Sequence, residues 1–344
     1  MGHHSNDLPW RSVAQVIHIG LDERGALDLD HLGVLLEQYT GRVRLVAITL
    51  ASNVTGIINP IHEIAERVHA AGAEIVVDCA QFAAHRAINM RPDDDPRHLD
   101  YVVISAHKMY APYGTGALIG KKDVFLQGDP DLVGGGTIDI VTVDEVQWAK
   151  PPDKEEAGSP NVVGGMALAH TALCLQEIGM DAIAKHEASL TSTLLKKLAA
   201  IDGIKIYGSA DPDHTLQRVG VVTFDLENLS HYLVAAILSF EGGIGVRNGC
   251  FCAHPYLFKL LNLSEYQAKK YQRAVMKGRK DNLPGLVRVS FGCYNNEDEV
   301  NWLAEMIERI VQGKYTGKYT QDPTSGEYWP DGYQINTKSY YSLR

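Results

Sequence analysis

The sequence predicts an α/β fold, with a mainly parallel sheet in a large first domain and a smaller α+β domain after it. Apolar runs of strand length at residues 43–49, 75–78 and 101–105 alternate with a helical pattern at 60–71. This alternating order is typical of parallel strands whose sheet is covered by helices. The chain has 344 residues, 45% of them hydrophobic, which is enough to bury a core in each domain.

The second half of the chain carries a different pattern. Two helices are expected first, at 164–178 and 181–200, and the second is amphipathic and leads out of the large domain. Strands are then expected near 220–225 and 287–291, with helices at 231–241 and 297–312. We therefore predict a large domain over residues 1–190, a small domain over 191–315, and an irregular tail rich in Tyr, Gly and Pro over 316–344.

Composition narrows the class of partner. A formal net charge of −10 argues against nucleic acid or an anionic membrane, because both reward clustered Lys and Arg. Small metabolites are the natural ligands that remain. No apolar run approaches the ~20 residues of a transmembrane helix, and no positive region followed by an apolar run opens the sequence. We expect a cytoplasmic protein.

The cysteines are odd in number and unevenly spaced, which favours reduced thiols over a disulfide framework; they are Cys79, Cys174, Cys250, Cys252 and Cys293. A zinc site built on Cys250 and Cys252 would need a second ligand pair, and the sequence offers no partner CxxC or HxxxH. We therefore predict no metal.

Lys108 is the first candidate functional residue. An apolar strand delivers it into a Gly-rich turn, directly behind Ser105 and His107. A lysine buried there would be pushed toward its neutral amine, which can attack a carbonyl, whereas a strand-end lysine that reaches water would not. A second apolar strand ends at Asp78, and ligands of open parallel sheets bind at the carboxyl ends of the strands.

These residues suit pyridoxal phosphate. This cofactor needs an amine for its aldehyde, an anion against its ring nitrogen, and polar groups around its phosphate. Lys108, Asp78 and the Ser105/His107 pair supply these three in turn.

Seven motifs, in this order, are shared with one family: HHSNDLPW at 3–10, SNVTG at 52–56, VDCAQ at 77–81, ISAHKMYAPYGTG at 104–116, EAGSPN at 156–161, VRNGCFCAHP at 246–255 and VRVSFG at 287–292. On these motifs the chain resembles, over nearly its whole length, the class V aminotransferase superfamily, and within it the cysteine desulfurases. The resemblance implies the pyridoxal phosphate-dependent transferase fold of type I. It also implies a homodimer, and a sulfur-acceptor protein as a further partner.

The resemblance assigns the cofactor contacts. Lys108 would form the Schiff base and later carry a proton, and Asp78 would face the ring nitrogen. Gln81 would bond the phenolic oxygen, and His3 would stack on the ring and help move protons, although Gly2 replaces the glutamate common before it. Phosphate donors would be Ser105 and His107, with Ser159 contributed by a second subunit.

The resemblance also assigns the substrate contacts. Arg288 would bind the substrate carboxylate with help from Asn53. The alternative partner for Arg288 is an acidic residue at the surface. Arg247 would adjust the conformation of the loop that follows it. Cys252 matches the desulfurase nucleophile, which would take sulfur from L-cysteine and release alanine. Cys250 departs from the common histidine and is closer to molybdenum cofactor sulfurases. It could be a resolving thiol, a sulfur relay or a small apolar side chain.

One departure from the family concerns the start of the chain. In the family a sizeable part of the large domain precedes the segment matched at His3, and it contributes to the phosphate pocket. We therefore expect a truncated or alternatively started member. Two alternatives to the desulfurase stay open: another class V activity (aminotransferase, epimerase or carbon–sulfur lyase), or a non-catalytic paralogue.

Overall fold

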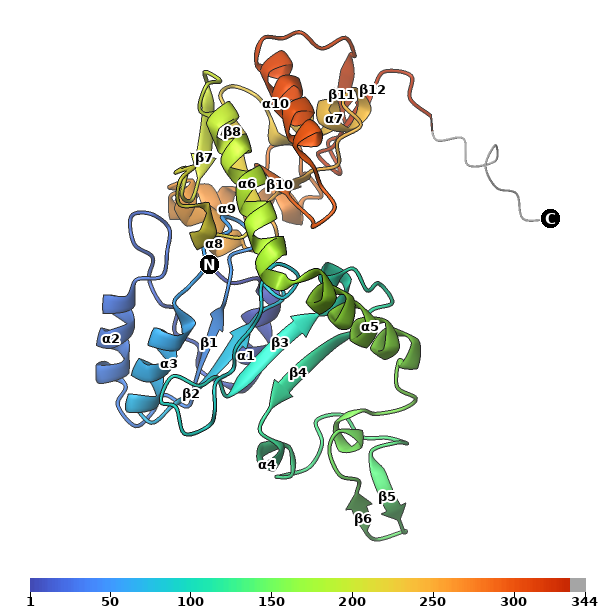
Figure 1. Cartoon of the computed structure of the whole chain (residues 1–344). Coiled ribbons are helices and arrows are strands. Elements are labelled where there is room, and N and C mark those ends of the chain that lie inside the picture. The colour runs from blue at the N-terminus through green and yellow to red at the C-terminus, as the bar shows by residue number, and fades with distance from the viewer. Residues whose placement is uncertain (335–344) are drawn as a thin grey trace, which may run out of the picture.

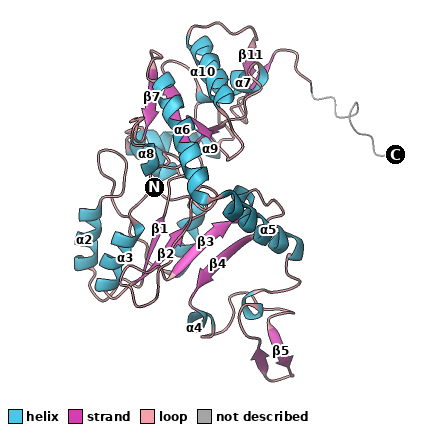
Figure 2. Ribbon diagram, in the orientation of Figure 1, coloured by secondary structure: helices cyan, strands magenta, loops and turns pink. Residues whose placement is uncertain are grey.

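The computed structural model describes residues 1–334, and its first half is built on a four-stranded sheet (Figures 1 and 2). In spatial order the strands are β1 (Leu45–Thr49), β2 (Glu74–Asp78), β3 (Tyr101–Ser105) and β4 (Gly116–Gly120). The first three are parallel, as the sequence predicts, and β4 is antiparallel to β3. The sequence did not predict β4, because its short run has glycine at both ends.

The register of the parallel strands brings their carboxyl ends to one edge. Thr49 pairs with Asp78, and Asp78 pairs with Val103 on the next strand. Ile75, Val76 and Val77 in β2 are all buried, as expected of a parallel strand covered on both faces. The last residues of β2 and β3 therefore open together onto one rim of the sheet.

Helices flank this sheet in Figure 1: α1 (Leu8–Val13), α2 (Leu29–Gln38) and α3 (Ile61–Ala70), after a short 3-10 turn η1 (His4–Asn6). Asp28 starts α2 by accepting a hydrogen bond from the His31 amide, which satisfies a free helix N–H. Ile64 and Val68 of α3 are fully buried in the core shared with the sheet.

An arm extends away from the sheet in Figure 1. It contains α4 (Lys122–Phe125), the hairpin β5 (Ile138–Val141) and β6 (Val146–Trp148), and the 3-10 turn η3 (Asp153–Glu155). Ile140, Val141 and Val146 of this hairpin are largely exposed.

Two long helices follow the arm, α5 (Val162–Ile178) and α6 (Met180–Leu198), and α6 runs from the first sheet up to the second (Figure 1). The predicted boundary at residue 190 falls inside α6, and it stays a prediction. Within residues 1–334 no single helix is long and apolar enough to cross a membrane. Taken together, α5 and α6 have sufficient length and apolar composition, but their axes are bent by 75° relative to each other.

The second sheet is antiparallel throughout, in the order β7 (Ile204–Tyr207), β8 (Val221–Leu226), β10 (Leu286–Ser290) and β9 (Arg247–Gly249). Its helices are α7 (His231–Phe240), α8 (His254–Leu260), α9 (Glu265–Met276) and α10 (Glu297–Val311), and the 3-10 turn η4 spans Thr215–Gln217. Phe224, Ile237 and Ile307 fill its core without exposure to solvent. Asn296 and Glu299 form a capping box that starts α10.

The tail differs from the irregular structure that the sequence predicts. Strands β11 (Tyr319–Gln321) and β12 (Tyr328–Pro330) pair in an antiparallel hairpin, closed by the Gly326 amide bonding the Asp322 carbonyl. Glu241 fixes its start by accepting hydrogen bonds from the Gly317 amide and the Tyr319 hydroxyl. The rest of the predicted tail, residues 335–344, lies outside the described residues.

Candidate active site

Lys108 lies just past the carboxyl end of β3, in the 3-10 turn η2 (Ala106–Met109). Its Nζ donates a hydrogen bond to Gln81 Oε1 across 3.1 Å. Burial, followed by the positive charge of Arg288, lowers the pKa of Lys108, and the carboxylate of Asp78 opposes that shift. The amine is therefore more often neutral near physiological pH than a solvated lysine, which is the form that attacks a carbonyl.

The neighbouring polar groups come from the same rim. Asp78 ends β2 and accepts a hydrogen bond from the Ala80 amide through Oδ1 at 3.0 Å. Ser105 ends β3, and its hydroxyl lies 2.8 Å from His107 Nδ1. His107 is exposed, so this pair can meet a ligand that approaches from solvent.

His3 lies near this cluster although it is far away in sequence. Burial, then the charge of Lys108, lowers the pKa of His3, and the charge of Asp78 opposes the shift. The next residue, His4, donates its backbone N–H to the Cys252 carbonyl at 2.8 Å. The first residues of the chain thus connect the sheet rim to the loop that carries Cys252.

Arg288 projects from β10 and is mostly buried. Its Nη1 donates to the Asn53 carbonyl at 2.8 Å, and its buried Nε has no hydrogen-bond partner in residues 1–334. Burial, then the charge of Arg247, lowers the pKa of Arg288 to about 10. Arg247 faces it across the β9–β10 pair. Two neighbouring guanidinium groups, one with an unused buried donor, form a site suited to an anion such as a carboxylate.

Asn53 is engaged by the Cys252 loop. Its side-chain amide donates to the Phe251 carbonyl at 2.8 Å, and the guanidinium of Arg288 lies over the Phe251 ring at 5.2 Å. Phe251 and Cys252 both have left-handed backbone conformations, with φ of 53° and 54°. The loop is therefore held against the arginine site, with the Cys252 side chain exposed.

Cys250 has different surroundings from Cys252. Its thiol donates to the Pro284 carbonyl at 3.1 Å, and burial, then the charge of Cys252, raises the pKa of Cys250 to about 12. A thiol that stays protonated at neutral pH is a poor nucleophile. Among the roles left open by the sequence, this environment favours a small apolar side chain.

Ser159 is the candidate that the structure leaves apart from the others. It lies in the exposed segment between η3 and α5, and no hydrogen bond within residues 1–334 joins it to Ser105 or His107. Its predicted role depends on a second subunit and stays a prediction.

Sequence reasoning missed the pair His4 and His254. Their rings stack with centroids 4.9 Å apart, and His4 Nε2 lies 3.2 Å from the His254 backbone nitrogen. Both flank Cys252, so they support the position of its loop. The only signal in the sequence was their presence in two of the motifs, since 250 residues separate them.

The donor set fits pyridoxal phosphate. The pKa of Lys108 is lowered, the carboxylate of Asp78 stands at the neighbouring strand end, and Ser105 and His107 lie beside them. The unpaired buried Nε of Arg288 adds a position for the carboxylate of an amino acid. Amine, anion, phosphate donors and carboxylate site are thus gathered on one side of the sheet.

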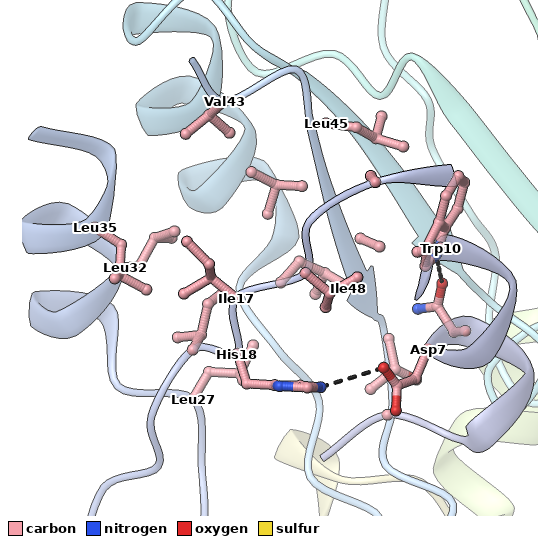
Figure 3. Close-up of a pocket in the computed structure, with 18 of the residues that line it drawn as sticks. Asp7, Trp10, Ile17, His18, Leu27, Leu32, Leu35, Val43, Leu45 and Ile48 are labelled. Carbon is pink, nitrogen blue, oxygen red and sulfur yellow. Dashed lines mark hydrogen bonds and ion pairs between the residues drawn. The ribbon is translucent and has the colours of Figure 1, made fainter. Parts of the chain in front are cut away.

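A pocket of about 410 Å³ opens elsewhere, beside the outer edge of β1 (Figure 3). Most of its walls are apolar, including Ile17, Leu32 and Val43, and its labelled polar contact joins His18 Nε2 to Asp7 Oδ1 at 3.2 Å. Neither Lys108 nor Arg288 lines it. The pocket therefore adjoins the candidate active site through His4 and Pro255, but does not include its lysine or arginine.

Comparison with known proteins gives a consistent result. The family model described as Aminotransferase class-V matches residues 1–303. A cysteine desulfurase of Enterobacter sp. (strain 638) is 37% identical over 318 residues, which are 90% of this chain and 69% of that protein. A probable cysteine desulfurase of Halalkalibacterium halodurans is 33% identical, over 91% of this chain and 70% of that protein.

Solved structures agree with these matches. The apo structure of a cysteine desulfurase from Thermococcus onnurineus NA1 superposes with a TM-score of 0.76 at 31% identity, covering 91% of this chain and 71% of that one. The Escherichia coli cysteine desulfurase CsdA, solved with an S-sulfonic acid, gives a TM-score of 0.75 at 28% identity, covering 90% of this chain and 70% of that one.

Proposed function

This chain belongs to the class V aminotransferase family, and from that premise we propose that it is a pyridoxal phosphate-dependent cysteine desulfurase. The family and its fold confirm the resemblance and the fold class that the sequence predicts. The observation that carries the proposal is the exposed thiol of Cys252, on a loop that Asn53 and Arg288 hold beside the candidate carboxylate site.

When bound, pyridoxal phosphate supplies an aldehyde for an amine and a ring that accepts electrons. Lys108 would hold it through Nζ, the neighbouring Gln81 would bond its phenolic oxygen, and Asp78 would place a negative charge at the ring nitrogen. Ser105 and His107 would bind the phosphate. Once Nζ is free, its lowered pKa lets it take a proton from the substrate's α-carbon and return one later.

Arg288 and Arg247 would bind the carboxylate of the substrate. The Arg288 fork can donate two parallel hydrogen bonds, and its Nε is available for one of them. The Asn53 carbonyl fixes the other end of the guanidinium. This contact sets the orientation of an amino acid, so that its side chain points toward the Cys252 loop.

Cys252 would then take the sulfur. Its thiolate attacks the sulfur of L-cysteine, a sulfur–sulfur bond forms, and the carbon–sulfur bond of the substrate breaks. The carbon fragment keeps the electron pair and gains a proton, so that L-cysteine and one thiol give L-alanine and one persulfide. A sulfur-acceptor protein, recruited at the exposed loop, would remove the persulfide.

The decisive experiment measures alanine released from L-cysteine, together with persulfide on the protein by mass spectrometry. Cys252→Ala is expected to abolish both products. Cys250→Ala is the matched control and should retain both, because its buried thiol stays protonated. Unchanged alanine release in Cys252→Ala would replace the desulfurase with another class V activity, and a protein that binds no cofactor would indicate the non-catalytic paralogue.

The proposal includes a homodimer. The exposed apolar residues Val162, Val163 and Met166 on α5 support it, because such a surface is expected to be covered by another chain. Sedimentation velocity tests this, and a monomer at working concentration would contradict it. A cytoplasmic location is also part of the proposal, supported by five free thiols.

A further inference from the structure

A second cluster of chemical groups lies at the opposite end of β3 from Lys108. His69 is in the last turn of α3, and His98 and Asp100 directly precede β3. One ligand atom from each of the three lies within 4.8 Å of the others. The sequence predicts no metal because its cysteine pair lacks partner ligands, whereas the fold brings these three residues together from separate segments.

Both histidines are held the same way. His69 Nδ1 lies 2.7 Å from the Pro96 carbonyl oxygen, and His98 Nδ1 lies 2.7 Å from the Asp95 carbonyl oxygen. A carbonyl oxygen only accepts, so each Nδ1 carries the proton and each neutral ring has its lone pair on Nε2. A backbone carbonyl bonded to the far nitrogen is the usual support of a histidine that binds a metal.

The two Nε2 atoms converge on one carboxylate. His69 Nε2 lies 2.9 Å from Asp100 Oδ2, and His98 Nε2 lies 3.1 Å from Asp100 Oδ1. Asp100 is buried, and its Oδ2 also accepts a hydrogen bond from the Ile75 amide at 2.9 Å. Two lone pairs and a carboxylate that face one another need a positive charge among them.

Lys121 supplies part of that charge in the structure. Its Nζ lies 3.2 Å from His98 Nε2 and 3.9 Å from Asp100 Oδ1. It also lies 3.7 Å from Asp93, whose side chain is 72% exposed, so it can leave the cluster along the surface. The rings of His69 and His98 stack with their centroids 4.2 Å apart, and the Nε2 atoms of both face Asp100.

We propose that His69, His98 and Asp100 form a binding site for a divalent transition metal ion of the zinc type, which displaces the amine of Lys121. Two imidazole nitrogens and one carboxylate oxygen are ligands that zinc accepts, with water in the remaining position. The ion would join the end of α3 to the segment that enters β3. Its role would be structural, because the site lies at the far end of the strand from Lys108.

The test measures zinc binding by the full chain after chelator treatment, using equilibrium dialysis with metal analysis. Wild type is expected to bind one equivalent, and His69→Ala and His98→Ala to bind at least ~10-fold more weakly. His62→Ala is the matched control, because His62 also lies on α3 and contacts the same segment through the Arg97 carbonyl, yet forms no ion pair within residues 1–334. It should bind zinc like wild type.

Lys121→Met gives a readout that misfolding cannot imitate. Removal of the competing ammonium should tighten zinc binding several-fold, and zinc should raise the melting temperature of this variant and of wild type but not of His98→Ala. The proposal is overturned if wild type takes up no zinc, if His69→Ala and His98→Ala bind like wild type, or if only Cys252→Ser removes the bound metal.

Discussion

The side-chain amide of Asn53 donates a hydrogen bond to the Phe251 carbonyl across 2.8 Å, although 198 residues separate them in sequence. The Asn53 carbonyl in turn accepts from Arg288. Asn53, which follows β1, therefore positions both the loop with the proposed nucleophile and the arginine proposed to bind substrate.

Asn53→Ala should lower kcat for L-cysteine about 10-fold while KM stays within about 2-fold of wild type. The lost hydrogen bond is worth about 1–3 kcal/mol when its partner stays buried, and about 1.4 kcal/mol is a factor of ten in rate. Gln312→Ala is the control, because it removes a side-chain amide whose hydrogen bond, to Glu308, lies on α10 and away from the loop. A raised KM with unchanged kcat would instead place the Asn53 side chain on the substrate.

Lys108→Ala should bind pyridoxal phosphate only reversibly and show no turnover, because its covalent attachment point and proton carrier are both lost. Borohydride reduction followed by peptide mapping checks this: the cofactor should be found on the peptide that contains residue 108 in wild type and on none in the variant. Lys269→Ala, with an exposed side chain on α9, should label like wild type.

Arg288→Lys should raise KM for L-cysteine about 10- to 100-fold, because an ammonium cannot reproduce the two parallel hydrogen bonds of a guanidinium to a carboxylate. Steady-state kinetics measure this. Arg279→Lys changes an exposed arginine paired with Asp281 and should leave KM unchanged. Equal KM values in the two variants would show that Arg288 does not bind the substrate carboxylate.

Stability should depend on pH through His231. Burial lowers the pKa of His231 from 6.5 to about 4. Between these values the unfolded chain binds the proton and the folded chain does not, so stability falls as pH falls through this window. From pH 7 to about pH 4.5 this residue should cost wild type about 2 kcal/mol, since one pKa unit is worth about 1.4 kcal/mol.

Urea unfolding of His231→Gln tests this, since glutamine can still bond the Leu283 carbonyl but does not titrate. The variant should lose about 2 kcal/mol less than wild type between the two pH values. His214→Gln, which alters an exposed histidine, should lose as much as wild type. An identical pH dependence in all three proteins would assign the acid sensitivity to other groups.

Local pattern was enough to predict the parallel strands and the rim they share. Asp78 and Lys108 could be placed there because each follows an apolar run of strand length, and such runs are read directly from the sequence. The helices α3, α7 and α10 were predicted within one or two residues for the same reason.

Contacts between distant segments could not be predicted in this way. The stacked pair His4–His254 and the cluster of His69 with His98 depend on tertiary packing. The hydrophobic periodicity of a single segment carries no information about such packing. The hairpin at Tyr319–Pro330 was missed because its strands have three residues each, too few to show alternation. Family motifs supplied the remaining site residues, such as Arg288 and Cys252.

The left-handed conformations of Phe251 and Cys252 store backbone strain in the loop that carries the thiol. Each such residue costs on the order of 1–3 kcal/mol, and the surrounding contacts must outweigh this cost for the loop to stay closed. Loss of a contact at Asn53 or His4 would let the backbone leave this conformation, so that the Cys252 side chain would no longer be fixed beside Arg288. The geometry of this loop therefore depends on contacts from the first part of the chain, and a change at Asn53 or His4 would act on Cys252 through the backbone.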